Sequence, residues 1–498
     1  MYLSDIILQF NEKNFEYDVY HLIQAFYPGT NIKTIYETDD REIPQGTEEM
    51  KFSVRYGRED ILFCVEKIRN AHTEVLFRKS CRLNAPDDRI STKNQLKRLV
   101  YSGLTELTGK KLPWGNLTGI RPVKILRSKL DEGYAPDEAA AYMQETYNVG
   151  DEKTALALEV AVREKKLLDE IRPQEGYSLY VDIPFCPSIC LYCSFGSHLI
   201  SRWNDYVPRY LESLFRELDM IAEAMKGTRL DTVYIGGGTP TSISAQHLNS
   251  LLDHIGSKFP LGELKEFTVE AGRPDTVTEE HLRVLRDHPV SRISINPQTM
   301  NQKTLDIIGR RHTVEETAER FHLARKLGFD NINMDIIVGL PGEGRDEILH
   351  TLEEIRSLDP DSLTVHSLAL KRATRLALFK DRYKDISFDN SAEIMRCTDD
   401  AARKMRMHPY YLYRQKNIAG NFENVGYARE GKDGIYNILI MEEKQTIMAA
   451  GCGGSTKFVT NGGANIDRVE NVKDLKNYIE RTDEMIERKR IGIDKFLS

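Results

Sequence analysis

Residues 180–195 read Y-V-D-I-P-F-C-P-S-I-C-L-Y-C-S-F and contain Cys186, Cys190 and Cys193, three of the seven cysteines in the chain. Their C-x3-C-x2-C spacing lies on a short loop that follows an apolar run. Thiolates this close in sequence can converge on one metal centre, and a zinc ion or an all-cysteine cluster would need a fourth ligand. The next cysteine, Cys397, is far along the chain, so no fourth ligand is evident. Three cysteines on a four-iron cluster would leave one iron open for chemistry.

The composition limits what the 498-residue chain can be. Hydrophobic residues make up 40% and charged residues 29%, which is typical of a soluble globular protein. The net charge of -7 disfavours non-specific binding of nucleic acid. We expect no membrane span and no signal peptide, because no long apolar window and no basic leader are visible. Few cysteines, clustered at one place, favour a reducing compartment, so we expect a cytoplasmic protein.

Residues 1–172 are expected to form an N-terminal α+β and helical extension whose role the sequence does not indicate. Asn14 is placed to cap a helix with Val19, Leu22, Ile23 and Phe26 on its apolar face. Strand-like runs follow at residues 51–55, 61–65 and 73–77. Residues 92–108 and 151–171 read as helices, and Arg172-Pro173 is a plausible domain boundary because proline ends a helix.

From residue 177 onward, strand-like and helix-like segments alternate. Strands are predicted at residues 178–183, 232–235, 266–270, 292–296, 331–338 and 362–368. Helices lie between them, and two begin at the N-caps Thr278 and Thr313, the second with Glu316 in a capping box. Six βα units imply a parallel sheet, and six strands make an open partial barrel. Active sites in such folds lie at the C-terminal ends of the strands, where the cysteine loop begins.

The predicted fold is therefore α/β, with a partial (βα)6 barrel over residues 173–385, the extension 1–172, and a small C-terminal α+β region. That last region, residues 386–498, is expected to close the site. Within it we predict a helix over 388–406, a strand over 435–441, a glycine-rich loop over 450–457 and an amphipathic charged helix over 471–489.

Several motifs stand where the predicted strands end. The G-G-G-T-P-T of residues 236–241 would let the backbone approach a ligand closely, although it also suits a tight turn. Glu270 ends the third strand, where a carboxylate is better placed for a site than for a core. Asp335 interrupts the apolar fifth strand and needs a partner. Arg310 is a candidate for that partner, in a buried salt bridge, or for a ligand carboxylate.

Taken together, these motifs resemble the radical S-adenosylmethionine (SAM) enzymes, and Y-x-x-I-P-F-C-x3-C-x-Y-C resembles their oxygen-independent coproporphyrinogen III oxidase group. The resemblance implies a [4Fe-4S] cluster on Cys186, Cys190 and Cys193, with SAM completing the open iron. It leaves little room for the zinc alternative. The positions that it implies for SAM binding are Tyr180, Tyr192, Gly237, Gly238, Thr239, Glu270, Gln298, Arg310, Asp335 and Ala369.

Within that group, L-T-G-I-R-P, E-A-G-R-P-D and V-H-S-L-A-L-K-R resemble the HemZ-type (coproporphyrinogen dehydrogenase) branch of anaerobic and facultative bacteria. The chain departs from the wider group by having Asp182 in place of a usual histidine, Phe195 in place of a further cysteine, and a long N-terminal extension. The resemblance implies an oxidoreductase of haem and porphyrin biosynthesis. It would convert propionates of coproporphyrinogen III into vinyls by oxidative decarboxylation, with a reductant such as flavodoxin or ferredoxin.

A tetrapyrrole with four propionates would need cationic partners. The candidates are Lys371, Arg372, Arg375, Arg414 and Lys416, with Tyr410, Tyr411 and Tyr413 as cover for the macrocycle. His366 is predicted to be a packed core histidine, and Cys452 a structural thiol. Two other functions stay open: a haem-binding or trafficking protein of the same group, and a radical SAM methylase with another substrate. The haem-binding branch carries an H-N-x-x-Y-W motif, which this chain lacks.

Overall fold

The structure of the protein is a computed structural model that describes residues 5–38, 48–69, 72–194, 196–369, 374, 376, 390–415 and 421–497. The chain divides into two compact units. The first comprises Met1–Leu158 with Gly420–Phe422, and the second comprises Glu159–Ala419 with Glu423–Ser498. The division falls within helix α5 (Asp151–Ile171), which has the bounds expected from the sequence.

The first unit is an α+β fold built on a five-stranded sheet with the order β2-β1-β3-β4-β5. Its strands are β1 (Asp5–Phe10), β2 (Asn31–Tyr36), β3 (Glu48–Tyr56), β4 (Asp60–Arg69) and β5 (His72–Arg82). Its other helices are α1 (Glu16–Phe26), α2 (Arg89–Thr108), α3 (Val123–Asp131) and α4 (Pro136–Tyr147). Alternate apolar side chains of the sheet pack with α1 and α2 into one core, because a strand directs every second residue to the same face.

Most of the local predictions for this unit are confirmed, but the start of α1 was wrong. The residue before the helix is Phe15, and no side chain caps the first turn. Asn14 instead accepts a hydrogen bond from Nη1 of Arg89, at 3.1 Å. The predicted apolar face of α1 is buried. Strands β1 and β2 were not predicted, and β3, β4 and β5 extend beyond the predicted runs.

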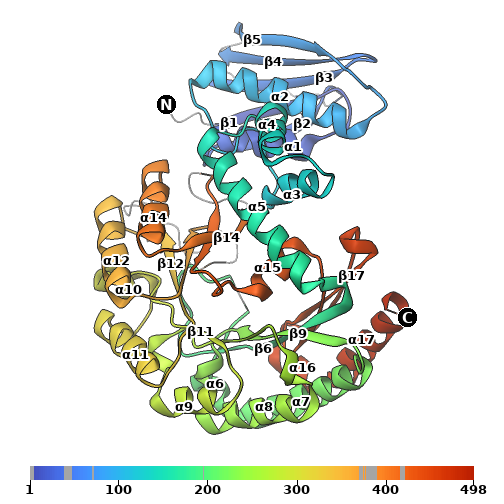
Figure 1. The fold of residues 1–498 in the computed structure, drawn as a ribbon. Coiled ribbons are helices and arrows are strands. Elements are labelled where there is room, and N and C mark those ends of the chain that lie inside the picture. The colour runs from blue at the N-terminus through green and yellow to red at the C-terminus, as the bar shows by residue number, and fades with distance from the viewer. Residues whose placement is uncertain are drawn as a thin grey trace. The chain divides into compact units, whose positions relative to one another are not determined.

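The second unit contains an eleven-stranded sheet with the order β14-β15-β13-β12-β11-β10-β9-β6-β16-β17-β18. Six consecutive, mutually parallel strands form its centre and confirm the predicted partial barrel. They are β6 (Gly176–Ile183), β9 (Arg229–Gly237), β10 (Glu266–Glu270), β11 (Arg292–Ser294), β12 (Ile332–Val338) and β13 (Ser362–Ser367). Figure 1 shows the helices between them on the outside of an arc whose inner layer is the sheet.

The connecting helices cover the apolar outer face of this sheet. They are α6 (Ile200–Trp203), α7 (Val207–Ala224), α8 (Ala245–Lys258), α9 (Glu279–Asp287), α10 (Gln302–Ile308), α11 (Val314–Lys326) and α12 (Arg345–Leu358). Both predicted N-caps are confirmed. Thr278 accepts a hydrogen bond from the backbone N–H of His281, and Thr313 and Glu316 form a capping box.

The C-terminal region extends the same sheet at both edges. After helix α14 (Ala392–Lys404), strand β15 (Asn424–Ala428) pairs antiparallel with β13, and β14 (His408–Tyr413) pairs antiparallel with β15 at the edge of the sheet. Strand β16 (Thr446–Ala450) pairs in parallel with β6, and β17 (Ser455–Thr460) and β18 (Asn465–Glu470) follow in antiparallel order. The strands at both edges of the partial barrel therefore come from the C-terminal part of the chain.

Two predictions for this region were wrong. Residues 435–441 form helix α15 (Ile435–Glu442), not a strand. The run is apolar almost throughout, so its sequence has no period, and its first N–H is held by Oε2 of Glu266 at 2.6 Å. Residues 471–489 do not form one helix but lie in two, α16 (Leu475–Glu480) and α17 (Thr482–Phe496). Between them the hydroxyl of Thr482 bonds to the carbonyl of Tyr478 at 2.8 Å.

No helix among the described residues is long and apolar enough to cross a membrane.

Candidate functional site

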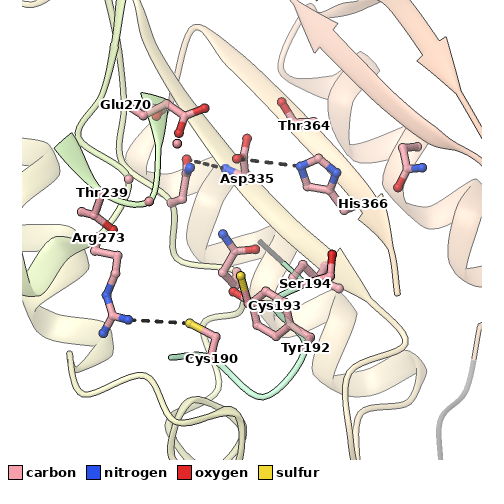
Figure 2. A pocket seen from close by; sticks show the side chains of 18 of the residues that line it. Cys190, Tyr192, Cys193, Ser194, Thr239, Glu270, Arg273, Asp335, Thr364 and His366 are labelled. Atoms are coloured by element: carbon pink, nitrogen blue, oxygen red, sulfur yellow. Dashed lines mark hydrogen bonds and ion pairs between the residues drawn. The ribbon is translucent and has the colours of Figure 1, made fainter. Parts of the chain in front are cut away.

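A cavity of about 400 Å³ opens at the C-terminal ends of the parallel strands (Figure 2). The residues expected from the sequence that line it are Cys186, Cys190, Tyr192, Cys193, Gly237, Gly238, Thr239, Glu270, Gln298, Arg310, Asp335 and Ala369. Among the residues predicted to hold the cluster or SAM, Tyr180 is the one that is not part of the lining. The structure thus brings together residues that are far apart in the sequence, from Cys186 to Ala369.

The cysteine loop is anchored to the glycine turn after β9. Strand β7 (Phe185–Cys186) pairs with β8 (His198–Leu199), and the N–H of Thr239 donates to the carbonyl of Phe185 at 2.7 Å. A Cβ atom on Gly238 would lie 2.6 Å from that carbonyl oxygen and 3.0 Å from Sγ of Cys186. The turn can approach the loop this closely only because residue 238 is glycine.

The sulfur atoms of two cysteines have identifiable donors. Sγ of Cys186 lies 3.4 Å from the hydroxyl of Thr239. Sγ of Cys190 accepts from Nη1 of Arg273 at 3.6 Å. All three cysteines line the cavity, but within the described part of the chain no three histidine, cysteine or carboxylate side chains are close enough to hold one metal ion.

Polar side chains occupy alternate positions on the inner face of the strands. Examples are Thr268 and Glu270 on β10, Asn333 and Asp335 on β12, and Thr364 and His366 on β13. Successive residues of a strand point to opposite faces, so these pairs share the cavity side while apolar neighbours face the helices. Thr268, Asn333 and Thr364 were not predicted from the sequence as site residues, and neither were Arg273, Arg292 and Asn296. Their signal was a polar residue at every second position of an otherwise apolar strand.

Asp335 is paired with His366 and not with Arg310. Nε2 of His366 lies 3.8 Å from Oδ2 of Asp335, and Nδ2 of Asn333 donates to Oδ1 of Asp335 at 2.7 Å. Burial opposes ionisation of Asp335, yet hydrogen bonds from His366, Asn333 and Thr364 hold its pKa below the ordinary value. The prediction that His366 is a packed core histidine was wrong, since its side chain is 29% exposed and lines the cavity.

Arg310 presents a buried cation to the cavity. Its Nη1 donates to the carbonyl oxygen of Asn296 at 2.8 Å, whereas its buried Nε has no hydrogen-bond partner among the described residues. Burial disfavours the charge, but Tyr192 and Cys190 beside it raise the pKa of the guanidinium. A buried donor without a partner is costly, so this site favours an anionic ligand group.

Glu270 and Asp182 flank the glycine turn and favour their protonated forms. Burial raises the pKa of Glu270 to about 7, although the hydroxyl of Tyr234 donates to its carboxylate. Burial likewise raises the pKa of Asp182 to about 8, and the hydroxyl of Tyr180 donates to it at 3.2 Å. Tyr180 stacks against Tyr234 with ring centres 6.1 Å apart, which explains why it lies behind the cavity wall.

The residues of the tyrosine-rich segment in and after strand β14 lie partly in the cavity wall and partly in an apolar cluster. Tyr411, Tyr413 and Gln415 line the cavity, whereas Tyr410 packs in an apolar cluster with Leu168 and Leu439. Arg414 also points away from the cavity, and burial lowers the pKa of its guanidinium to about 10. Tyr410 and Arg414 are therefore not part of the lining of this cavity, and a role for them in substrate binding stays a prediction. The other candidates, Lys371, Arg372, Arg375 and Lys416, lie outside the described residues, as does Phe195.

Cys452 is buried in the turn between β16 and β17. Its Sγ lies 3.2 Å from the carbonyl oxygen of Lys473, and burial raises the pKa of its thiol. It does not line the cavity, which agrees with a structural thiol.

Comparison with known proteins places this geometry in a family. A sequence model of the Radical SAM superfamily matches residues 180–355. The oxygen-independent coproporphyrinogen-III oxidase-like protein HemZ of Bacillus subtilis (strain 168) is 44% identical over 405 residues, which are 79% of this chain and 80% of that protein. The heme chaperone HemW of the same organism is 32% identical over 307 residues, which are 61% of this chain and 75% of that protein.

The solved structure of coproporphyrinogen III oxidase (HemN) from Escherichia coli shares the fold. It matches with a TM-score of 0.51 at 22% sequence identity, over 65% of this chain and 73% of that one. The arrangement of the strands and the identity to HemZ lead to the same conclusion. The chain belongs to the radical SAM superfamily, whose members use a [4Fe-4S] cluster and S-adenosylmethionine, and within it to the oxygen-independent coproporphyrinogen III oxidase-like group.

Proposed function

We propose that this protein is a SAM-dependent coproporphyrinogen dehydrogenase, which oxidatively decarboxylates propionates of coproporphyrinogen III to vinyls in porphyrin biosynthesis. One observation carries the proposal: a single cavity joins the cysteine loop to the polar strand ends, in a chain 44% identical to HemZ. The reaction would take place in the reducing cytoplasm, without oxygen, with electrons from a carrier such as flavodoxin or ferredoxin.

The cysteine loop fits a [4Fe-4S] cluster. Cys186, Cys190 and Cys193 reach the cavity from one short loop, and hydrogen-bond donors already lie beside two of the sulfurs. Donors of this kind stabilise thiolates, which are the ligand form of cysteine. We assign these three cysteines as the cluster ligands, with the fourth iron left for SAM.

The cavity wall also fits the charges of SAM. Arg310 supplies a buried cation with a free Nε for the methionyl carboxylate, and Glu270 beside the glycine turn supplies an acceptor for the amine. Gln298 has a φ of 68°, rare for a residue other than glycine, and two backbone hydrogen bonds to β12 hold it there. When bound, the reduced cluster and SAM supply a carbon radical that removes a hydrogen atom from the substrate.

The opposite wall is suited to a carboxylate-bearing substrate. Nδ1 of His366 lies 3.4 Å from the hydroxyl of Tyr413, and Nε2 of Gln415 lies 3.5 Å from the same hydroxyl. These three groups offer N–H and O–H donors, and the Tyr411 ring stacks on Tyr413 with centres 6.1 Å apart. Donors beside flat aromatic surfaces would suit the propionates and the pyrrole rings of a tetrapyrrole.

The test is a single anaerobic incubation of reconstituted, chemically reduced protein with SAM and coproporphyrinogen III. We expect protoporphyrinogen IX, carbon dioxide, methionine and 5′-deoxyadenosine. S-adenosylhomocysteine with a methylated product would establish a methylase instead. SAM cleavage without any change in the porphyrinogen would show that the substrate is a different molecule.

Cysteine variants of the loop test the ligand assignment without a change of fold. Cys186→Ala, Cys190→Ala and Cys193→Ala should each lose the cluster absorbance and SAM cleavage. Cys397→Ala is the matched control, because Cys397 lies on α14 and does not line the cavity. A loop variant that retains a full cluster would contradict the ligand assignment.

A haem-handling role is the second candidate, favoured by the 32% identity to a protein named heme chaperone HemW. The absence of an H-N-x-x-Y-W motif weighs against it. Titration of the protein with haem distinguishes the two functions. Tight, stoichiometric haem binding with no turnover of coproporphyrinogen III would support the chaperone and reject the dehydrogenase.

A further inference from the structure

Arg273 ties the end of β10 to the cysteine loop. Figure 2 shows Arg273 directed at Cys190, whose Sγ accepts from Nη1 of Arg273 at 3.6 Å. The same Nη1 donates to Oγ of Ser188 at 2.8 Å and to the carbonyl oxygen of Ser188 at 3.3 Å. The residue is 3% exposed and lines the cavity. The arginine side chain is a cation, so a positive charge after β10 lies against one sulfur of the cysteine loop.

Asp275 orients and partly neutralises this cation. Nε and Nη2 of Arg273 donate to its two carboxylate oxygens at 3.0 and 2.8 Å. This fork geometry uses one edge of the guanidinium and leaves Nη1 directed at the loop. Burial opposes ionisation of Asp275, but Arg273 holds its pKa below the ordinary value. Arg273 and Asp275 therefore form a fixed, oppositely charged pair beside Cys190.

The contacts of Cys186 with Thr239 and of Cys190 with Arg273 differ in charge. Cys186 meets the neutral hydroxyl of Thr239, whereas Cys190 meets the guanidinium of Arg273. Hydrogen bonds to the sulfurs of an iron–sulfur cluster, and net charge near it, set its reduction potential. A positive donor stabilises the more negative, reduced state, and a buried one is weakly screened by water.

We propose that Arg273 is a positioning residue that raises the reduction potential of the cluster through Cys190, and that Asp275 limits this effect. The external reductant supplies the electron, and Arg273 keeps its protons throughout. Because the inference needs only the cluster shared by the family, it is independent of the substrate proposed above.

Arg310 is the other cation that influences Cys190, and the test must separate the two. The charges of Arg310 and Cys190 interact, but Nη1 of Arg310 donates to the carbonyl oxygen of Asn296. We assign Arg310 to the carboxylate of SAM. Arg310 is the same in the unmodified protein and in the variants of Arg273 and Asp275, and without SAM its surroundings do not depend on bound ligand, so a difference in midpoint between these proteins reports on Arg273 and Asp275.

The experiment is a one-electron redox titration of the reconstituted protein without SAM, followed by the electron paramagnetic resonance signal of the reduced cluster. Arg273→Gln should lower the reduced-to-oxidised ratio at a fixed potential about tenfold, which is a shift of about 59 mV to more negative values. Arg273→Lys keeps a charge without the fork and should shift the midpoint less, in the same direction. Asp275→Asn should move it to more positive values.

The midpoint should shift to more negative values in the Arg273 variants and to more positive values in Asp275→Asn. Disorder of the cysteine loop would not produce shifts of opposite sign, so this result would indicate an electrostatic effect of the two charges. Arg283→Gln is the matched control, because Arg283 is exposed on α9 and pairs with Glu279, and it should leave the midpoint unchanged. An Arg273→Gln variant with full iron content and the original midpoint would overturn the proposal. If Arg273→Gln fails to assemble the cluster, the midpoints of Arg273→Lys and Asp275→Asn test the proposal instead. Midpoint shifts of the same sign in these two variants would overturn the proposal.

Discussion

His366 on β13 lies next to Asp335 on the neighbouring strand β12, with Nε2 of the imidazole 3.8 Å from Oδ2 of the carboxylate. Figure 2 shows both side chains beside Thr364, directed into the same space. The donors around Asp335 lower its pKa, so the carboxylate is ionised at neutral pH despite its burial. An ionised acceptor is therefore held where the proposal places SAM.

Loss of this acceptor should weaken SAM binding and spare the cluster. We expect Asp335→Asn and Gln298→Ala each to reduce SAM affinity about tenfold, since a hydrogen bond to a charged group is worth about 1.5–3 kcal/mol. Anaerobic calorimetry gives the affinity, and iron analysis gives the cluster content. Asp287→Asn, at an exposed position on α9, is the control. Unchanged SAM affinity in both cavity variants would refute the assignment.

Glu270 and Asp182 should make the cluster-free protein less stable as pH rises. Burial raises their pKa values to about 7 and about 8, so the folded protein holds protons that the unfolded chain releases near pH 4. The free energy of unfolding must then fall as pH rises through this window. For Glu270 the loss is at most about 3 kcal/mol.

Urea unfolding between pH 5 and 9 measures this slope. Glu270→Gln should flatten the curve up to about pH 7, and Asp182→Asn up to about pH 8, because neither amide titrates. Parallel curves for the variants and the unmodified protein would show that these carboxyl groups titrate normally in the folded state.

The C-terminal helix depends on one fully buried ion pair. Lys489 on α17 donates to Glu217 on α7, and both side chains are 0% exposed. The hydroxyl of Tyr478 donates to the same carboxylate at 2.6 Å, and so does the N–H of Gly451 at 2.8 Å. Removal of one partner leaves an uncompensated buried charge, so Lys489→Met should lower the free energy of unfolding by about 3–5 kcal/mol.

Two further variants identify the origin of that loss. Lys495→Met, on the exposed side of the same helix, should change stability by less than about 0.5 kcal/mol. Glu217→Gln combined with Lys489→Met removes both charges and should recover part of the loss. A double variant no more stable than Lys489→Met would mean that packing, and not charge, causes the effect.

Gly426 on β15 makes room for the Tyr411 ring in the cavity wall. A Cβ atom at residue 426 would lie 1.9 Å from Cε1 of Tyr411, so Gly426→Ala must displace the ring. We expect a loss of about 1–3 kcal/mol in the free energy of unfolding. Gly256→Ala in helix α8 is the control, because its nearest contact would be 3.9 Å, and it should be neutral or stabilising. Thermal unfolding of the two variants checks both expectations.

Local patterns explain the parts of the fold that could be predicted. The alternation of strands and helices, the caps at Thr278 and Thr313, and the bounds of α5 all rest on residues within a few positions of one another. The cysteine spacing and the polar residues at the strand ends are also local features, and they predicted the cluster ligands and part of the site. In parallel strands those ends meet at one edge of the sheet, so sequence order predicted that residues such as Glu270 and Gln298 share one cavity with the cysteines.

Contacts between distant segments decided the rest. Residues 435–441 have no hydrophobic periodicity from which a helix could be predicted. The carboxylate of Glu266, far earlier in the chain, accepts a hydrogen bond from the first N–H of α15. Whether His366 and Tyr180 face the cavity or the core depends on neighbouring strands, which is why both were misplaced. The sequence by itself determined the family, the cofactors and the cysteine loop, because spacing encodes them. Only the tertiary structure paired Asp335 with His366 and Cys190 with Arg273, since such pairs depend on the packing of strands far apart in sequence.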